Sequence, residues 1–482
     1  MVFSSVIFLF CFLPLVLAAY WIAPRRARNG MLLVASLIFY AWGEVFYVGV
    51  MLASIAMNYA FGLWLDRARG GRDERFALAI AVIANLGLLG WFKYANFLVE
   101  NVNRLLTGNP GAPIELAPVH LPLGISFFTF HALSYLIDVR RGVSPPMRNP
   151  ANMALYIALF PQLIAGPIIR FHDIAASILQ RDSRVSDVAA GVRRFIIGLG
   201  KKVLIANVMG RAADSIFEIP SAQLTPGLAW LGALSYALQI YFDFSGYSDM
   251  AIGLGRVFGF RIRENFEHPY VSRSVTEFWR RWHISLSNWF RDYLYVPLGG
   301  NRSGTSRTYL NLLIVFLLCG LWHGASWTFV VWGLYHGGFL VLERSFRGRR
   351  LRVWSPLAHA ATLLVVLVGW VIFRAETLSQ AGAFLAAMAG QAPVTGTEWY
   401  LEMYLDPVFA MAFAAGLVGS VPWLPALIRA SRAAVARSEG GRRTALDVLG
   451  QLAALAALIA VGLVSAMQLS IATHNPFIYF RF

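Results

Sequence analysis

Apolar windows long enough to cross a membrane recur along almost the whole chain, from Val2 to Met467. A spanning helix needs about 20 mostly apolar residues. Windows of this kind occur at 2–21, 30–48, 50–65, 76–98, 121–138, 152–170, 192–214, 226–250, 356–373, 406–424 and 448–468. Only 14% of the 482 residues are charged, against roughly 25% in soluble domains. The pattern excludes a soluble enzyme and predicts one all-α, polytopic membrane domain over 1–482, with about 11–13 spanning or re-entrant helices.

One apolar stretch is too long to be a single span. The 35 residues from Thr308 to Leu342 contain no Asp, Glu, Lys or Arg. One helix of that length would reach about 50 Å, whereas the hydrocarbon core is about 30 Å thick. The stretch must therefore break or turn back, and non-helical backbone at this depth is tolerated only where protein encloses it or where it lines a cavity. Glycines that offer places for the break are Gly320, Gly324, Gly333, Gly337 and Gly338.

The distribution of charge predicts an orientation in the membrane. The formal charge of +16 arises from 41 Lys and Arg against 25 Asp and Glu. The basic residues gather in short connectors at 25–28, 67–75, 140–141, 344–352 and 429–443. Short basic connectors are typical of cytoplasmic loops, so both termini are predicted to lie outside. No nucleic-acid-binding signature accompanies the charge, and we expect membrane lipid rather than nucleic acid as a partner. The two cysteines, Cys11 and Cys319, lie in apolar runs and predict neither disulfides nor a metal site.

The segment 241–307 interrupts the membrane pattern by combining arginines with aromatic residues. Near its centre, Trp279, His283 and Ser287 would share one face of a helix. The nearby arginines are Arg280, Arg281 and Arg291. Two interpretations stay open. The segment is either an amphipathic helix at the cytoplasmic interface, or an entrance for a phosphate-bearing substrate, because guanidinium groups bind phosphate well.

His323 lies near the middle of the uncharged stretch, in Gly320-Leu-Trp-His-Gly-Ala-Ser. An ionisable residue at membrane depth is a functional hypothesis by default, and the alternative is a neutral, hydrogen-bonded core histidine. A neutral imidazole in a water-poor cavity can take a proton from a hydroxyl that attacks a carbonyl. His336 and His131 are interpreted as helix contacts.

The run from Tyr241 to Asp249, Tyr-Phe-Asp-Phe-Ser-Gly-Tyr-Ser-Asp, gathers two carboxylates and several hydroxyls. It would either orient catalytic side chains or mark a helix end that enters the cytoplasm.

Several motifs together resemble the membrane-bound O-acyltransferase family. They are Tyr241-Phe-Asp-Phe-Ser-Gly-Tyr-Ser-Asp-Met-Ala-Ile-Gly, Glu277-Phe-Trp-Arg-Arg-Trp-His-Ile-Ser-Leu-Ser, Arg291-Asp-Tyr-Leu-Tyr, Leu298-Gly-Gly-Asn-Arg and Gly320-Leu-Trp-His-Gly-Ala. The resemblance is closest to the bacterial branch that acetylates alginate and other exopolysaccharides. It extends from Met1-Val-Phe-Ser-Ser to the terminal Pro476-Phe-Ile-Tyr-Phe.

This resemblance implies a fold, a site and a reaction. The fold is a set of helices around a central tunnel, with the catalytic core over 241–345. His323 occupies the family's essential histidine position and would be the general base. His283 occupies the second position and would orient the acceptor hydroxyl, bind the thioester or stabilise the oxyanion. Arg280, Arg281 and Arg291 would attract the phosphates of coenzyme A. His131 departs from the family pattern, in which glutamine is expected.

The implied donor is acetyl-CoA, which would enter from the cytoplasmic side of a bacterial inner membrane. The implied acceptor is a secreted polysaccharide such as alginate, reached through a periplasmic acetyltransferase or another polysaccharide-modifying partner. Two alternatives stay open. A D-alanyl or longer-acyl transferase would draw on an acyl-carrier protein, and a phospho-sugar transporter or flippase would use the buried histidines as a proton relay.

Overall fold

The computed structural model describes residues 1–106, 113–346, 354–392, 395–396, 398–437 and 440–471. Within these ranges the chain forms helices and connecting loops and no strand. Five of the described helices are long and apolar enough to cross a membrane. They are α3 (Val48–Arg67), α4 (Asp73–Leu106), α14 (Thr305–His323), α16 (Ser355–Arg374) and α20 (Gly440–Ile471). The predicted all-α, polytopic membrane fold is confirmed.

The N-terminal third of the chain forms one bundle, in which α3 packs against α4 and α5 and α2 packs against α6. Its other elements are η1 (Phe8–Phe12), α1 (Leu13–Ile22), α2 (Arg28–Ala41), α5 (Ile125–Arg140), α6 (Pro150–Ala158), α7 (Phe160–Leu163) and α8 (Phe171–Leu179). Four of the apolar helices in the described chain are too short to be counted as spans by length alone, and two of them, η1–α1 and α2, belong to this bundle.

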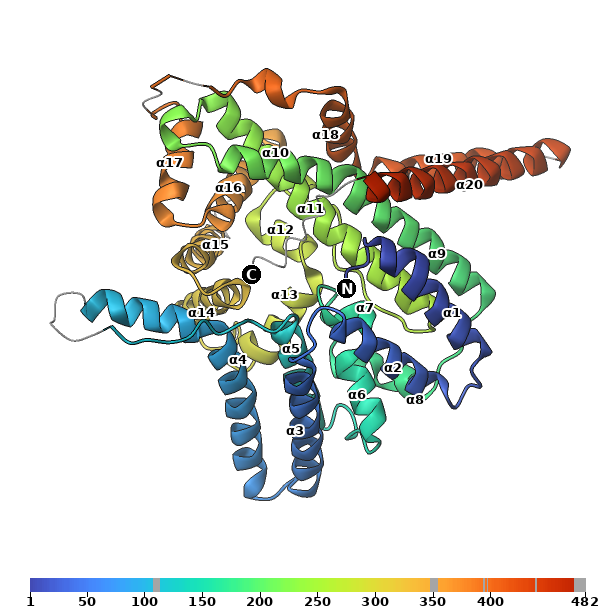
Figure 1. The fold of residues 1–482 in the computed structure, drawn as a ribbon, viewed down its shortest axis with the longest axis vertical. Coiled ribbons are helices and arrows are strands. Elements are labelled where there is room, and N and C mark those ends of the chain that lie inside the picture. The colour runs from blue at the N-terminus through green and yellow to red at the C-terminus, as the bar shows by residue number, and fades with distance from the viewer. Residues whose placement is uncertain (107–112, 347–353, 393–394, 397, 438–439, 472–482) are drawn as a thin grey trace.

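The middle of the chain supplies the centre of the molecule. Helix α11 (Pro226–Val257) packs along α9 (Val185–Gly200), the π-helical turn η2 (Lys201–Ala206) and α10 (Asn207–Phe217). Two short helices follow, α12 (Val275–Arg281) and α13 (Ile284–Phe290), and then a second π-helical turn, η5 (Arg291–Tyr295). Viewed down the shortest axis, the other helices form a ring around α11, α12 and α13 (Figure 1).

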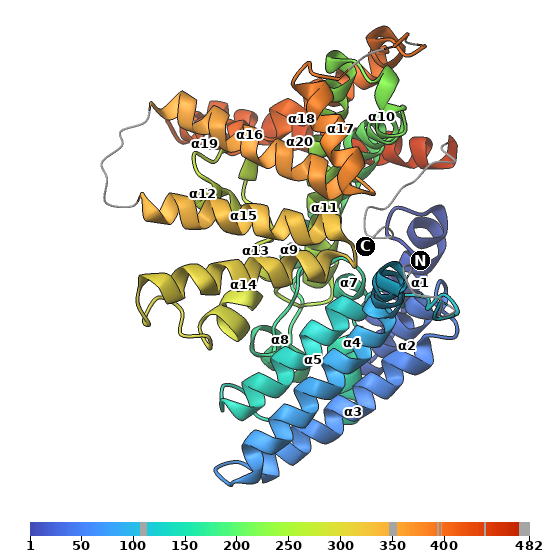
Figure 2. The same cartoon turned by 90° about the vertical axis from the view of Figure 1, so that its left-hand side faces the viewer.

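The remaining elements lie around this centre, except that α19 (Trp423–Arg437) and α20 project outward from it as a pair (Figure 1). The others are α14, α15 (Trp327–Ser345), α16, α17 (Leu378–Met388) and α18 (Pro407–Gly419), together with the short turns η3 (Ser221–Gln223), η4 (Pro269–Val271) and η6 (Leu401–Tyr404). Helices α14, α15 and α16 lie side by side and run along the short axis (Figure 2).

The window 152–170 is not a span, contrary to its hydropathy. Helix α6 ends at Ala158, α7 covers only Phe160–Leu163, and the backbone then runs on without helix to Arg170. Pro161 lies in the first turn of α7, and a Cβ on Gly166 would lie 2.6 Å from the Pro161 carbonyl oxygen. The segment is buried inside the protein, where irregular backbone is permitted at membrane depth.

The uncharged stretch does turn back, as its length requires. Helix α14 ends at His323, the chain turns at Gly324, and α15 begins at Trp327. The two helices pack closely because glycines face each other: a Cβ on Gly320 would lie 2.2 Å from the Phe329 carbonyl oxygen, and a Cβ on Gly333 would lie 2.3 Å from that of Phe316. Small residues at such contacts let helix backbones approach closely.

This contact makes a testable prediction about stability. We expect Gly333→Ala to lower the free energy of unfolding by about 1–3 kcal/mol, because its methyl group forces the backbones of α14 and α15 apart. Gly338→Ala, on the same helix with nothing within 4 Å of the added carbon, should change it by no more than about 0.5 kcal/mol. Thermal unfolding in detergent compares the two variants. Equal stabilities would show that the close contact is unimportant.

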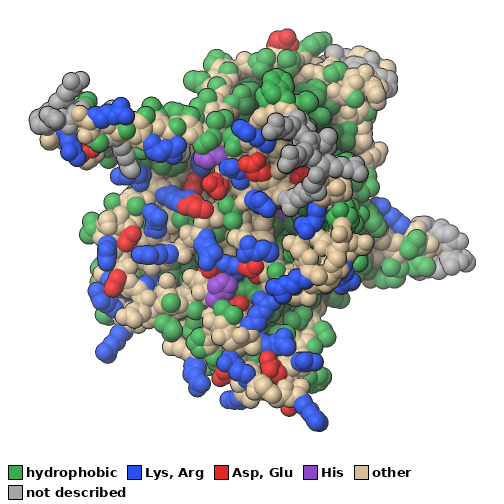
Figure 3. All heavy atoms as spheres, turned by 180° about the vertical axis from the view of Figure 1, so that it is seen from behind, with side chains coloured by type: hydrophobic (Ala, Val, Ile, Leu, Met, Phe, Trp, Pro, Cys, Tyr) green, Lys and Arg blue, Asp and Glu red, His purple; other side chains and the backbone are tan. Residues whose placement is uncertain are grey.

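Basic residues concentrate on one face of the molecule. The α3–α4 turn, the end of α5, the start of α14 and the end of α15 all point to one side, and the N-terminus lies on the opposite side (Figure 2). Lys and Arg side chains are spread over that first face (Figure 3). Parts of the predicted basic connectors 344–352 and 429–443, and the C-terminal residues 472–482, lie outside the described residues.

Candidate active site

The two histidines singled out by sequence lie in one buried aromatic cluster, although 40 residues of chain separate them. His323 is the last residue of α14, and His283 directly precedes α13. Trp322 contacts both rings, with its centroid 6.2 Å from that of His283 and 4.9 Å from that of His323. The tertiary structure thus brings the predicted pair together.

The wall around His323 is made of aromatic rings from three helices. Trp332 of α15 and Phe373 of α16 each meet the His323 ring edge-on at 5.2 Å. Within the described residues, the indole nitrogens of Trp322 and Trp332 and Nε2 of His283 are buried and have no hydrogen-bond partner. Buried polar groups are normally paired, so these groups are suited to bind a polar ligand.

The other histidines of the apolar segments pack against aromatic rings. The ring of His336 lies between Trp279, at 5.0 Å, and Trp332, at 5.2 Å. His131 is fully buried on α5 and lies 5.7 Å from the ring of Tyr156. Both arrangements agree with the interpretation of these residues as contacts between helices.

The backbone at His283 differs from the sequence-based expectation. Helix α12 ends at Arg281, and His283 adopts the left-handed conformation, with φ 44° and ψ 54°, before α13 begins. Trp279, His283 and Ser287 therefore do not share one face of a continuous helix. The helix breaks because the segment at Asn265 takes over its backbone hydrogen bonds: the Asn265 carbonyl accepts from Ile284 N–H at 2.9 Å. Left-handed non-glycine residues cost about 1–3 kcal/mol and concentrate at functional sites.

Helices α12 and α13 also do not form an amphipathic helix at the membrane surface. Their side chains Phe278, Trp279, Trp289 and Phe290 are buried, and both helices lie inside the ring (Figure 1). The aromatic residues of this segment build the interior of the protein.

The contacts described for the three predicted phosphate-binding arginines are with carboxylates and not with His283 or His323. Arg281 pairs with Glu277 at 2.9 Å and Arg291 with Asp292 at 2.7 Å, whereas Arg280 is exposed. The backbone N–H of Arg273 and the guanidinium of Arg281 hold the pKa of Glu277 below its usual value. Two of the three arginines thus have carboxylate partners.

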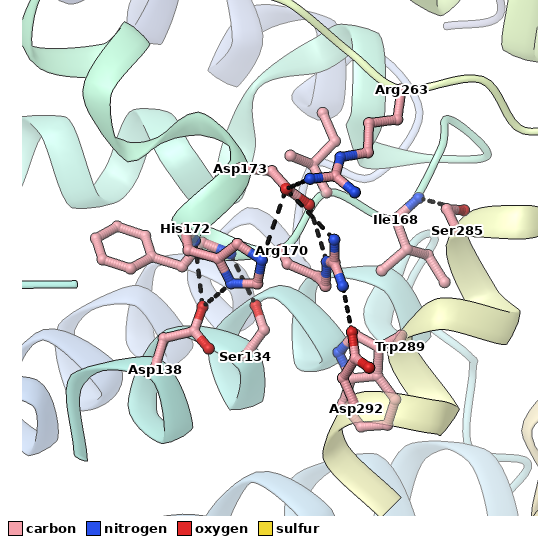
Figure 4. Close-up of polar contacts among 12 residues, drawn as sticks. Ser134, Asp138, Ile168, Arg170, His172, Asp173, Arg263, Ser285, Trp289 and Asp292 are labelled. Atoms are coloured by element: carbon pink, nitrogen blue, oxygen red, sulfur yellow. Dashed lines mark hydrogen bonds and ion pairs between the residues drawn. The ribbon is translucent and has the colours of Figure 1, made fainter. Parts of the chain in front are cut away.

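A second set of arginines, which the sequence did not single out, lies in a polar network beside α13 (Figure 4). Arg170 donates to Asp173 at 2.9 Å and also pairs with Asp292, and Arg263 pairs with Asp173 at 2.7 Å. Burial alone would raise the pKa of Asp292, but Arg291 and Arg170 outweigh it and lower that pKa. Together with Arg261, Arg170 and Arg263 line a small pocket that reaches Ser285 of α13.

The two acids of the 241–249 run lie on α11 and form ion pairs with lysines of η2. Asp249 pairs with Lys201 at 2.7 Å, and Asp243 pairs with Lys202 at 2.9 Å. Because α11 continues to Val257, the run is not a helix end. One of its hydroxyls does reach toward the site, since Ser248 accepts a hydrogen bond from Asn265 at 3.0 Å.

A cavity of about 430 Å³ lies between α9, α11 and the segments 264–268 and 419–424. Its polar lining includes Lys201, Ser245, Ser248 and Asn265. The Asn265 side chain also contacts His283, at 3.2 Å between Oδ1 and Nδ1. One side chain therefore contacts both the cavity and the histidine.

Sequence reasoning missed two residues that hold the end of α14. Lys93 of α4 donates from Nζ to the carbonyl oxygens of Trp322 and, at 3.2 Å, of His323. The hydroxyl of Tyr94 donates to the Leu321 carbonyl at 2.6 Å. These bonds satisfy carbonyls that a helix C-terminus leaves unpaired. A lysine inside an apolar window is itself a signal of function, and Lys93 stands out in 76–98 on that ground.

Within the described ranges, no group of three or more His, Cys, Asp or Glu side chains could hold a metal ion.

Comparison with known proteins gives consistent matches. The family model described as MBOAT, membrane-bound O-acyltransferase family, matches residues 123–374. The chain is 43% identical to a "Probable alginate O-acetylase" of Azotobacter vinelandii and 42% identical to one of Pseudomonas aeruginosa, in each case over 100% of both chains. It is 38% identical to a "Peptidoglycan O-acetyltransferase" of Helicobacter pylori over 81% of this chain and 80% of the relative.

Proposed function

This chain belongs to the membrane-bound O-acyltransferase family, and from that premise we propose that it takes an acetyl group from acetyl-CoA for O-acetylation of a secreted polysaccharide. It is a multi-pass membrane O-acetyltransferase. The proposal adds the donor, the acceptor class and the direction of transfer, from the cytoplasm to the periplasm across a bacterial inner membrane.

The observation that carries the proposal is that the rings of His283 and His323 both contact the ring of Trp322. In the proposed reaction, an acceptor hydroxyl attacks the thioester carbon while His323 takes its proton. The carbon–sulfur bond breaks, the thiolate of coenzyme A leaves and takes up the proton, and the acetyl group stays on the acceptor oxygen. No covalent intermediate on this chain is needed.

The charged face supports a cytoplasmic entry for the donor. The start of α14 and the end of α15 point to one side of the molecule (Figure 2), and Lys and Arg side chains are spread over that face (Figure 3), as the positive-inside rule expects of the cytoplasmic side. The phosphates of coenzyme A fit such a surface, with Arg280, Arg281 and Arg291 as the proposed contacts. The N-terminus then lies in the periplasm, and we propose the same side for the C-terminus.

The acceptor is proposed from the names of the relatives, which act on alginate and peptidoglycan. Alginate is the preferred candidate because the identity to the alginate O-acetylases extends over the full chain. A periplasmic partner enzyme that holds the polymer is part of the proposal.

Thioester consumption by detergent-purified protein tests this function. We expect release of free coenzyme A from acetyl-CoA and transfer of labelled acetyl to an alginate oligosaccharide when a periplasmic partner is added. Turnover with a D-alanyl carrier protein and none with acetyl-CoA would favour the D-alanyltransferase alternative. If neither thioester is consumed with the partner present, the proposed donor is wrong.

A further inference from the structure

The side chain of Asn265 lies against His283 in the interior of the protein. Asn265 and His283 are each 1% exposed. The side-chain oxygen Oδ1 of Asn265 lies 3.2 Å from Nδ1 of His283, 3.1 Å from the backbone nitrogen of Ser285 and 2.8 Å from the Ser285 hydroxyl. Its amide nitrogen lies 3.0 Å from the hydroxyl of Ser248.

The orientation of this amide follows from its neighbours. A backbone N–H can only donate, so the atom that faces Ser285 N must be the amide oxygen. The amide nitrogen then faces the Ser248 hydroxyl, which can accept. A flipped amide would set the NH₂ group of Asn265 against the N–H of Ser285 and leave both donors unpaired in the interior, at a cost of about 1–3 kcal/mol each.

The oxygen of Asn265 in turn determines which nitrogen of His283 carries the proton. An amide oxygen accepts and cannot donate, so Nδ1 must bear the hydrogen for the contact to be a bond. A neutral imidazole has one N–H, and its Nε2 is then an acceptor. The hydroxyl of Ser285, 3.4 Å from Nδ1, donates to Asn265 and presents a lone pair to the same proton.

The second ring nitrogen of His283, Nε2, is not used by the contacts with Asn265 and Ser285. It is buried and has no hydrogen-bond partner among the described residues. The ring of Phe244 packs edge-on against the His283 ring at 4.5 Å, and the ring of Trp322, which is next to His323, lies at 6.2 Å. The lone pair of Nε2 is therefore available to a bound molecule.

We infer that Asn265 is a positioning residue that holds His283 as the Nδ1–H tautomer, so that neutral His283 presents Nε2 to the substrate as a hydrogen-bond acceptor. The inference deepens the proposed acyl transfer and rests on it for the identity of the substrate. The group that binds Nε2 is an O–H or N–H donor, which is either the acceptor hydroxyl or an amide of the pantetheine arm.

This assignment separates the roles considered for His283. Binding the thioester carbonyl or stabilising the oxyanion requires a proton on Nε2, which the neutral Nδ1–H form lacks. Orienting a donor group requires a lone pair, which this form has. The structure thus selects the accepting role.

The test combines the tautomer with kinetics. In protein labelled with ¹⁵N- and ¹³C-histidine, the His283 signals are identified by their loss in His283→Gln, and their shifts distinguish Nδ1–H from Nε2–H. We expect Nδ1–H in the wild type. Asn265→Asp keeps an acceptor at this position and should keep a proton on Nδ1. Asn265→Leu has a similar volume but no hydrogen-bond acceptor, so His283 should no longer be held as the Nδ1–H tautomer. We expect kcat to fall at least about tenfold, since a wrong tautomer lowers the rate strongly at other histidine sites.

Ser248→Ala is the matched control, because it removes the partner of the Asn265 amide nitrogen and leaves the oxygen in place. It should keep the Nδ1–H tautomer, because the Asn265 oxygen still faces Nδ1. A raised KM for acetyl-CoA in Asn265→Leu would identify the pantetheine amide as the donor to Nε2, and a raised KM for the acceptor would identify its hydroxyl.

The outcomes that overturn the inference differ from those that overturn the proposed function. An Nε2–H signal in the wild type, or wild-type kcat in a folded Asn265→Leu, would reject the role of Asn265 while acetyl transfer stands. If the wild type consumes no thioester, the proposed function fails, and the tautomer still tests the geometry. Should Asn265→Leu not fold, the wild-type signal and rescue by Asn265→Asp decide.

Discussion

His323→Ala should lower acetyl transfer by about 10²–10⁴-fold, the range expected when a positioned general base is removed. The base acts in the transition state, so kcat and kcat/KM should fall together while KM for acetyl-CoA stays near that of the wild type. Release of free coenzyme A under steady-state conditions measures all three quantities. Activity within a few-fold of wild type in a folded variant would show that another group takes the proton.

Two further variants separate loss of the base from loss of packing. His323 is 8% exposed and contacts Trp322, Trp332 and Phe373, so alanine also removes ring contacts. His323→Gln keeps much of the volume and should lose activity to a similar degree. His359→Ala removes a histidine that bonds to the Ser272 carbonyl, away from these contacts, and should retain activity.

Lys202→Met should lower the free energy of unfolding by about 3–5 kcal/mol, because it removes the lysine that pairs with the buried carboxylate of Asp243. The two side chains are 3% and 1% exposed, with 2.9 Å between Nζ and Oδ1. The double variant Lys202→Met/Asp243→Leu should recover most of this loss, since replacing a buried pair by apolar residues is often neutral. Unfolding in detergent at neutral pH compares the variants.

An exposed ion pair provides the control for this experiment. Arg104 and Glu100 are paired at 2.6 Å on α4, with side chains 68% and 60% exposed. Arg104→Ala should change stability by no more than about 0.5 kcal/mol. If Lys202→Met costs as little as Arg104→Ala, the buried pair does not stabilise the contact between η2 and α11.

Local composition was sufficient to predict the class of fold. Spans predicted at 50–65 and 356–373 correspond to α3 and α16, because lipid requires each segment to satisfy its own backbone hydrogen bonds and to expose apolar side chains. The turn within 308–342 was predictable for the same reason, since its length exceeds the thickness of the membrane. Hydropathy indicates how strongly a segment avoids water, and the class of fold and this turn follow from that tendency alone.

Features that depend on long-range contacts were predicted wrongly or missed. The window 152–170 is as apolar as a span, yet protein encloses it and its backbone is irregular. The segment around His283 has helical spacing, yet Asn265 breaks the helix by taking the hydrogen bond of Ile284. An apolar window indicates that side chains avoid water, but it does not show whether lipid or protein surrounds them. Helical spacing likewise does not show that another segment competes for a backbone hydrogen bond.

The sequence by itself determined an all-α membrane protein, its family, and a histidine at a turn in an uncharged stretch. Only the tertiary structure decided what surrounds that histidine. In it, the ring of His283 lies beside that of Trp322, the amine of Lys93 donates to the His323 carbonyl, and the side-chain amide of Asn265 contacts His283. The physical reason is range: residues far apart in the chain acquire their partners from helix packing, whereas the transfer of apolar side chains into lipid is decided residue by residue.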